Sequence, residues 1–161
     1  MANALVTGSF DPVTVGHFAL IEKAARAFDT VVVAIFRNPD KVYFFTEEER
    51  RFLIETGLRE LGLANVSVDI SDGYVADYAK EKGIGFVVRG VRNADDMAYE
   101  LEMARYNNRR NPELETFLWG APAEQSDLSS TKVREYLKKG EIPKALLLPS
   151  VAEAIATIQK K

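Results

Sequence analysis

Short runs of apolar, largely β-branched residues alternate along this 161-residue chain with segments of helical periodicity. The runs cover residues 4–9, 30–36, 86–88 and 116–119, and between the second and third of these Val66, Val68 and Ile70 alternate with polar residues as in a half-exposed strand. Runs of this length and composition are typical of strands, and strands separated by helices pair in parallel through right-handed crossovers. The alternation therefore predicts an α/β fold with a doubly wound, five-stranded parallel sheet and extra helices at the C-terminus.

Helix signals fill the gaps between these runs. One apolar stripe at helical spacing is formed by Phe18, Ile21, Ala25 and Phe28. Residues 46–49 (Thr-Glu-Glu-Glu) have the spacing of a capping box, in which the first side chain accepts from a free N–H and the last reaches back. Gly83 is expected to end a helix that begins near Tyr74. Residues 150–153, directly after Pro149, predict a second capping box at the start of a last helix.

Length and composition place further bounds. With 47% apolar and 28% charged residues and no Pro- or Ser-rich linker, residues 1–161 are expected to form one domain. A net charge of -3 gives no overall attraction to nucleic acid or to a membrane surface. The absence of cysteine excludes disulfides and thiolate chemistry, and the single histidine, His17, excludes a multi-histidine metal cage. Neither a signal peptide nor a run of about 18 apolar residues is found, so we expect a cytoplasmic protein with no membrane partner.

The loop after the first run is the least generic part of the sequence. In a doubly wound sheet, ligands bind beyond the carboxyl ends of strands where the strand order reverses. Residues 7–17 match neither of the common glycine-rich phosphate loops, but Gly8 and Gly16 permit close backbone approach. His17 is expected at a helix start, where free N–H groups favour anions. A lone histidine is more often structural, and this position favours a functional role.

A second unusual loop follows the fourth run. Residues 89–92 (Arg-Gly-Val-Arg) place two guanidinium groups around a glycine, and arginine forms bidentate bonds with phosphate oxygens. The alternative is that these are surface arginines paired with Asp95, Asp96 or Glu100.

Two more loops lie at the same edge of the expected sheet. Lys41, after the second run, could add a third cation, although by itself it reads as a solvated loop residue. Ser129, Ser130 and Thr131 supply consecutive hydroxyls at a helix start, which suits either an anion site or simple capping. Cations, hydroxyls and helix N-termini converging without a nucleophilic cysteine or a carboxylate pair favour phosphoryl chemistry.

These motifs closely resemble those of the bacterial phosphopantetheine adenylyltransferases, in the nucleotidylyltransferase superfamily. The matching segments are residues 8–17 (GSFDPVTVGH), 45–50 (FTEEER), 89–92 (RGVR), 96 with 99–100, 113–116 (ELET) and 129–131 (SST). The T-x-G-H element marks only the superfamily, and its combination with the other segments is specific to this family. The resemblance covers nearly the whole chain and implies a Rossmann-like fold. Two departures, Met97 in place of a usual phenylalanine and Thr131 in place of a frequent serine, remove no required donor or charge.

The resemblance implies a reaction of ATP with 4'-phosphopantetheine that gives dephospho-coenzyme A and pyrophosphate, with magnesium riding mainly on the ATP phosphates. The implied catalytic residues are His17, Ser9, Lys41 and Arg92. The implied ATP-binding residues are Ser9, Phe10, His17, Gly90, Val91, Arg92, Glu100, Gln125, Ser126, Asp127, Leu128, Ser129, Ser130 and Thr131. The implied phosphopantetheine-binding residues are Ser9, Lys41, Val75 and Arg89. A homohexamer and feedback inhibition by coenzyme A are also implied.

Two other functions stay open at this point. One is a nucleotidylyltransferase for another phosphorylated acceptor, such as nicotinamide mononucleotide or glycerol phosphate, because the grip of Arg89 and Lys41 would accept many phosphates. The other is a non-catalytic sensor of adenine nucleotides or coenzyme A. The presence of His17 and Ser9 argues against a sensor, which needs no transition-state donors.

Overall fold

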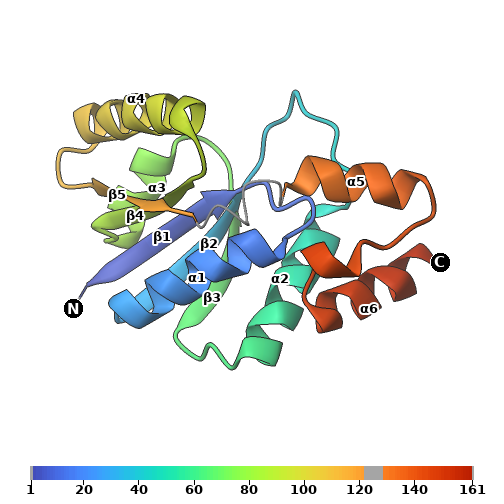
Figure 1. Cartoon of the computed structure of the whole chain (residues 1–161). Coiled ribbons are helices and arrows are strands. Elements are labelled where there is room, and N and C mark those ends of the chain that lie inside the picture. Colours follow the sequence, from blue (N-terminus) through green and yellow to red (C-terminus); the bar gives the residue numbers. More distant parts are fainter. Residues whose placement is uncertain (1, 122–128, 161) are drawn as a thin grey trace.

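A computed structural model describes residues 2–121 and 129–160, and its centre is a five-stranded parallel sheet (Figure 1). The strands are β1 (Asn3–Gly8), β2 (Thr30–Phe36), β3 (Val66–Ser71), β4 (Phe86–Val91) and β5 (Glu115–Gly120). They pair in the order β3-β2-β1-β4-β5, and every neighbouring pair is parallel. The predicted α/β class and the five predicted strands are therefore confirmed.

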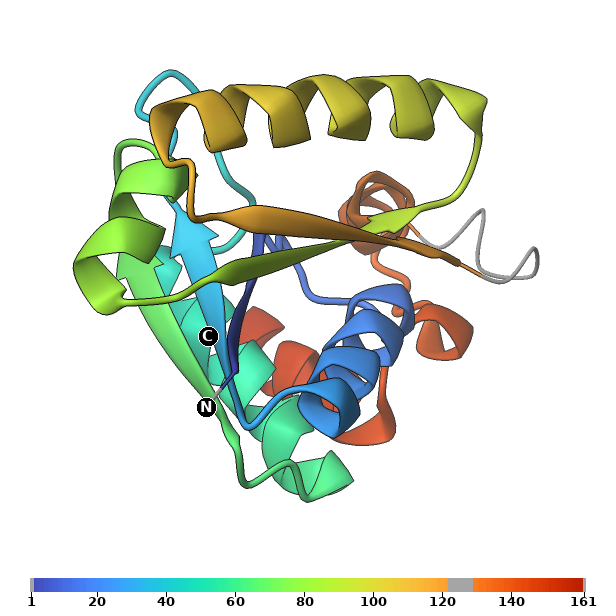
Figure 2. The same cartoon turned by 90° about the vertical axis from the view of Figure 1, so that its left-hand side faces the viewer.

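Helices cover both faces of this sheet. They are α1 (Val15–Ala27), α2 (Glu47–Leu61), α3 (Val75–Lys82), α4 (Ala94–Arg110), α5 (Ser130–Lys138), a short 3-10 turn, η2 (Lys144–Leu146), and α6 (Pro149–Gln159). Figure 2 shows α4 and α1 on opposite sides of β4 and β5. In the described ranges, no helix combines the length and the apolar character that crossing a membrane requires.

Alternation along β1 divides the core into two layers. Ala4 and Val6 are fully or nearly buried against the face that carries α1, α2, α5 and α6. Leu5, between them, is buried on the other face, against α3. Strand side chains point alternately to the two faces, so a strand covered on both sides is apolar throughout. This is why β1 reads in the sequence as a continuous apolar run.

Most of the predicted helix signals are confirmed, and one predicted buried position differs. Thr46 and Glu49 form the predicted capping box at α2, and Gly83 ends α3 with a φ of 68°. On α1, Phe18 and Ile21 are buried as the stripe predicts. The third buried position of α1 is Ala24 rather than the predicted Ala25.

The predicted capping box at residues 150–153 is wrong. Helix α6 begins at Pro149, its N-cap is Leu148, and no side chain caps it. Proline is favoured at the first helical position, so the helix starts two residues earlier than predicted and Ser150 falls inside the first turn. The backbone N–H of Ser150 donates instead to Glu60 Oε1 at 2.7 Å. Its hydroxyl is buried without a hydrogen-bond partner among the described residues.

A close approach of α1 and α2 gives a testable prediction about stability. A Cβ atom on Gly57 of α2 would lie 2.1 Å from Cζ of the buried Phe18 on α1. We expect overpacking by Gly57→Ala to cost about 3 kcal/mol, offset by about 1 kcal/mol of better helix propensity, for a net loss of about 2 kcal/mol. Urea unfolding measures this loss. Gly85→Ala is the control, because its Cβ would meet no described atom within 4 Å; equal stability of the two variants would contradict the prediction.

Candidate functional site

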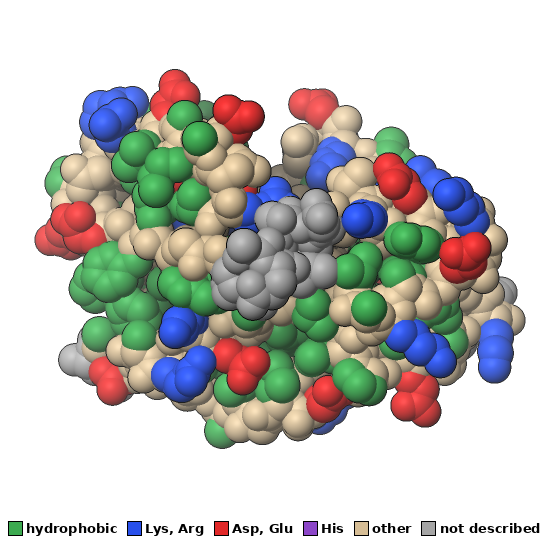
Figure 3. Space-filling model, in the orientation of Figure 1, with side chains coloured by type: hydrophobic (Ala, Val, Ile, Leu, Met, Phe, Trp, Pro, Cys, Tyr) green, Lys and Arg blue, Asp and Glu red, His purple; other side chains and the backbone are tan. Residues whose placement is uncertain are grey.

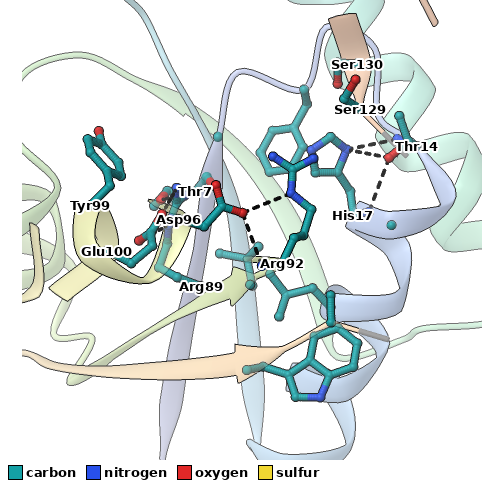
Figure 4. A pocket seen from close by; sticks show the side chains of 18 residues that line it. Thr7, Thr14, His17, Arg89, Arg92, Asp96, Tyr99, Glu100, Ser129 and Ser130 are labelled. Atoms are coloured by element: carbon teal, nitrogen blue, oxygen red, sulfur yellow. Dashed lines mark hydrogen bonds and ion pairs between the residues drawn. The ribbon is translucent and has the colours of Figure 1, made fainter. Parts of the chain in front are cut away.

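A cavity of about 380 Å³ opens at the carboxyl ends of β1 and β4 (Figure 4). The strand order reverses between these two strands, which is where doubly wound sheets bind ligands. Figure 3 shows a notch between the part of the molecule around α4 and the part around α5, with Lys or Arg side chains on its sides. The lining residues include Gly8, Phe10, Thr14, His17, Arg89, Gly90, Arg92, Asp96, Tyr99, Glu100, Trp119, Ser129 and Ser130.

His17 is fixed at the floor of this cavity by the start of its own helix. The backbone N–H of Thr14 donates to His17 Nδ1 at 3.0 Å, and the Thr14 hydroxyl accepts from the His17 backbone N–H. Figure 4 shows the imidazole ring facing Thr14, with these contacts as dashed lines. A backbone N–H can only donate, so Nδ1 carries the lone pair and the ring proton lies on Nε2. The Phe10 ring packs edge-on against the imidazole with centroids 5.0 Å apart, and Nε2–H is left to donate to a ligand.

The charge state of His17 follows from its surroundings. Burial, with a smaller contribution from the positive charges of Arg89 and Arg92, lowers the pKa of His17 from 6.5 to about 4. The imidazole is therefore neutral at pH 7. It can serve as a hydrogen-bond donor whose state does not change near neutral pH.

This lowered pKa predicts a pH dependence of stability. The folded-state pKa lies below the ordinary value, so the unfolded chain binds this proton more readily, and acid favours unfolding. The stabilisation is complete above pH 6.5 and is lost as the pH falls toward 4. For a half-buried ring that borders an open cavity, we expect the free energy of unfolding to fall by about 1–2 kcal/mol between pH 7 and pH 5. Urea unfolding of the wild type and of His17→Gln, which cannot titrate here, checks this; equal losses in both would contradict it.

Arg89 and Glu100 form a partly buried ion pair in the wall of the cavity. Arg89 Nη2 lies 2.8 Å from Glu100 Oε1, and Arg89 Nε lies 3.0 Å from Oε2. Arg89 Nη1 donates to the backbone oxygen and the hydroxyl of Thr7, at 2.6 and 2.9 Å. The side chain of Glu100 is 8% exposed and that of Arg89 is 31% exposed. Four of the five N–H groups of Arg89 are engaged in these contacts, so a bidentate grip on a phosphate requires it to release a present partner.

Arg92 is held more loosely. Its Nε donates to Asp96 Oδ2 at 3.1 Å, and its backbone N–H donates to the same oxygen. Within the described ranges its terminal guanidinium nitrogens have no protein partner. Both arginines thus pair with carboxylates of α4, as the alternative reading expected, and both still line the cavity.

A smaller cavity of about 150 Å³ lies on the other side of this ion pair, between α3, α4 and the sheet. Thr7, Arg89, Tyr99 and Glu100 line both cavities, so the ion pair lies where the two cavities adjoin. The smaller cavity is also lined by Val75, Met103 and Asn107. The structure therefore places Val75 in a partly apolar pocket next to Arg89.

The serine hydroxyls at the start of α5 are hydrogen-bonded within the protein. Ser129 is the N-cap and accepts from the backbone N–H of Lys132, and Ser130 donates to the backbone oxygen of Pro12. Both line the larger cavity. Thr131, which accepts from Arg134, is outside the described lining. The other predicted ATP-binding residues of this segment, Gln125, Ser126, Asp127 and Leu128, lie outside the described residues.

Three other predicted residues stand apart from the described lining of the larger cavity. Val91 is a buried residue at the end of β4. Ser9 bonds through its backbone oxygen to Arg50 Nη1 at 3.0 Å. Lys41 is exposed, with Nζ 5.4 Å from the centre of the Tyr43 ring. Of the predicted cations, the structure thus brings Arg89 and Arg92 to the cavity, and Lys41 lies on the neighbouring loop.

Comparisons with known proteins identify the family. A family model described as cytidylyltransferase-like matches residues 5–136. The phosphopantetheine adenylyltransferase of Synechococcus sp. (strain JA-3-3Ab) is 41% identical over 150 residues, which are 93% of this chain and 93% of that protein. The phosphopantetheine adenylyltransferase of Streptococcus pneumoniae (strain CGSP14) is 40% identical over 156 residues, 97% and 96% of the two chains. The chain belongs to the phosphopantetheine adenylyltransferases. It is therefore a nucleotidyltransferase, and the resemblance drawn from the motifs is confirmed.

The same fold occurs in a more distant enzyme of known structure. A Plasmodium falciparum nicotinic acid mononucleotide adenylyltransferase complexed with NaAD superposes with a TM-score of 0.74 at 16% sequence identity, over 99% of this chain and 97% of that one. At this identity the likeness shows the fold alone.

Several residues of the site were missed by sequence reasoning. Thr7, at the end of β1, anchors Arg89, and nothing in the sequence marks it. Trp119 lines the cavity although it reads as an ordinary strand residue. Thr14 could have been found, because it stands three residues before His17, the spacing of a capping box with histidine in place of the usual Glu or Gln.

Proposed function

We propose that this phosphopantetheine adenylyltransferase family member transfers the adenylyl group of ATP to 4'-phosphopantetheine, giving dephospho-coenzyme A and pyrophosphate. The observation that carries the proposal is the neutral His17, held as an Nε2–H donor in a cavity that also contains Arg92 and the N-terminus of α5. A second, partly apolar cavity lies behind Arg89. The larger cavity suits a nucleoside triphosphate, and the smaller cavity suits the arm of an acceptor.

The reaction needs no general base from the protein. The phosphate monoester of the acceptor has a second pKa of about 6, so it is largely a dianion at neutral pH. One of its oxygens forms a bond to the α-phosphorus of ATP, the bond from that phosphorus to the bridging oxygen of the β-phosphate breaks, and pyrophosphate leaves with the electron pair. This is a direct in-line displacement without a covalent enzyme intermediate.

The residues around His17 would stabilise the charge that gathers on the transferring group. His17 Nε2–H would donate to a phosphate oxygen, and the terminal nitrogens of Arg92 would bind a second one. Free backbone N–H groups at the start of α5, next to Ser129, add a further anion site. The other ATP contacts proposed from the motifs, from Phe10, Gly90 and Glu100, come from residues that line the same cavity.

The acceptor would bind on the other side of the site. Its arm would enter the smaller cavity beside Val75, and its phosphate would reach Arg89, Ser9 and Lys41. Lys41 is exposed on a loop and has a long flexible side chain, so it can turn from Tyr43 toward a phosphate. Arg89 would exchange one of its present contacts for the phosphate.

Magnesium is expected as a companion of ATP. In the part of the chain that the structure describes, no group of three or more His, Asp or Glu side chains could hold a metal ion. The two carboxylates that line the larger cavity, Asp96 and Glu100, are bonded to arginines. These residues do not fit a protein-built magnesium site, and no step of the proposal depends on one.

Pyrophosphate release tests the proposed reaction. The wild-type chain is incubated with ATP, magnesium and one of four acceptors: 4'-phosphopantetheine, unphosphorylated pantetheine, nicotinamide mononucleotide or glycerol phosphate. We expect release with 4'-phosphopantetheine alone. Release with another phosphorylated acceptor instead would change the assigned substrate, and ATP binding without release for any acceptor would favour a sensor.

The assembly and regulation implied by the family belong to the same proposal. We expect a homohexamer in the cytoplasm that is inhibited by coenzyme A. Sedimentation velocity measures the assembly, and the same pyrophosphate assay with added coenzyme A measures the inhibition.

A further inference from the structure

Arg50 is the largest fully buried side chain among the described residues, and the proposed mechanism does not use it. Only 1% of the residue is exposed, yet it forms no ion pair with any residue that the structure describes. Its Nε donates to the backbone oxygen of Phe45 at 3.2 Å, and its Nη1 donates to the backbone oxygen of Ser9 at 3.0 Å. The guanidinium lies 4.0 Å from the centre of the Tyr43 ring. The charge is thus held by carbonyl dipoles and an aromatic face.

A buried carboxylate makes the opposite set of contacts nearby. Asp11 is 2% exposed, and its two oxygens accept from the backbone N–H groups of Phe44 and Phe45, at 2.8 and 2.9 Å. Asp11 therefore takes the N–H of Phe45, and Arg50 takes the carbonyl of the same residue. Each bond is charge-assisted and lies out of water, which makes it stronger than an exposed hydrogen bond.

These bonds join two loops of the candidate site. The first loop, residues 9–14, includes Ser9. It runs from the end of β1 to the start of α1, the helix that carries His17. The second loop, residues 37–46, follows β2 and carries Lys41. Lys41 and Arg50 both lie against the ring of Tyr43, so the ring links the buried guanidinium to the exposed ammonium group.

We propose that Arg50 is a positioning residue for the acceptor phosphate: by bonding to Ser9 and Phe45 and stacking on Tyr43, it sets the place of Lys41 relative to Ser9. The inference rests on the proposed function, in which Lys41 and Ser9 bind that phosphate. His17 and Arg92, which are also expected to bind ATP phosphates, are held by other contacts, from Thr14 at the N-cap of α1 and from Asp96 on α4. Loss of the Arg50 contacts should therefore affect acceptor binding far more than ATP binding.

The test compares Arg50→Lys with a matched control. Lysine keeps the charge but lacks the planar fork that reaches two carbonyls and stacks on the ring. We expect Arg50→Lys to raise the KM for 4'-phosphopantetheine by about tenfold or more, because small misplacements of binding groups have effects of this size, with the KM for ATP changed less than about twofold. Arg51→Met is the control: Arg51 is the next residue of the same helix and also bonds a backbone oxygen, that of Val68 on β3. It should change neither KM.

A double-mutant cycle separates positioning from a general structural role. If Arg50 acts through Lys41, Arg50→Lys should raise the acceptor KM much less when Lys41 is already alanine. If Arg50→Lys does not fold, Tyr43→Leu, which removes the ring and keeps both hydrogen bonds of Arg50, should give the same selective change in the acceptor KM.

Three outcomes would overturn the inference. They are an equal rise of both KM values, full additivity of Arg50→Lys with Lys41→Ala, and, if Arg50→Lys does not fold, an acceptor KM unchanged by Tyr43→Leu. These results are distinct from failure of the proposed function, which would appear as no pyrophosphate release by the wild type with 4'-phosphopantetheine. In that case the inference about the acceptor phosphate falls with the function.

Discussion

Replacing His17 by alanine is expected to lower kcat by about 10²–10³-fold, with a much smaller change in the KM for ATP. The expected loss has this size because the imidazole is neutral and its Nε2–H is already oriented by Thr14, so it donates to developing charge without rearrangement. In the proposed site, ground-state binding of ATP would also draw on Arg92 and the start of α5, which the substitution leaves in place. Initial rates of pyrophosphate release at varied ATP measure both constants.

A control separates the lost donor from the altered helix start. Thr14→Ala removes the hydroxyl that accepts from the His17 N–H, and it keeps the backbone donor to Nδ1. This variant should lose about 1 kcal/mol of stability, the usual effect of a lost N-cap, while kcat falls only a few-fold. An unchanged kcat in His17→Ala would remove the histidine from the mechanism, and equal kcat losses in the two variants would assign the effect to the helix.

Replacing Arg89 by methionine is expected to affect both stability and acceptor binding. It leaves the carboxylate of Glu100, 8% exposed, without its partner. Because Arg89 itself keeps 31% exposure, we expect a loss of about 2–3 kcal/mol in the free energy of unfolding, somewhat less than for a fully buried pair. The KM for 4'-phosphopantetheine should rise far more than the KM for ATP. If only the ATP value moved, the assignment of Arg89 to the acceptor would be wrong.

The double variant Arg89→Met/Glu100→Leu separates the two effects. Removing both charges eliminates the unpaired carboxylate, so most of the lost stability should return, because an apolar pair of similar size can replace a buried ion pair. The acceptor KM should stay high, since no cation is restored. Urea unfolding and steady-state kinetics on the same preparations measure the two quantities. A double variant as unstable as Arg89→Met would show that Glu100 is not the source of the instability.

The sequence predicted the fold well because the relevant signals are local and periodic. Strands covered on both faces, such as β1, are necessarily apolar, and the edge strand β3 shows instead the alternation of Val66, Val68 and Ile70. The position of His17 at the start of α1 follows from the same pattern. The loops after β1 and β4 meet at one cavity because the carboxyl ends of parallel strands lie at the same edge of the sheet.

The partners of the side chains could not be predicted in the same way. Arg89 reaches Glu100 and Thr7, the latter 82 residues earlier, and only the packing of α4 on the sheet decides this choice. The direction of Lys41 depends on an aromatic ring two residues away, and a loop has no periodicity to indicate it. Arg50 reads as one charged residue in a run of charged residues, yet it is the one that the structure buries.

The ion pair of Arg89 and Glu100 has a consequence for how the two cavities fill. Both cavities share this pair as a boundary, so a ligand on either side that draws on Arg89 alters the charge balance on the other side. Thermodynamic linkage then requires the effect to be mutual. If the first ligand changes the affinity for the second by some factor, the second changes the affinity for the first by the same factor. If ligands occupy both cavities, we therefore expect the two occupancies to be coupled through the pair of Arg89 and Glu100.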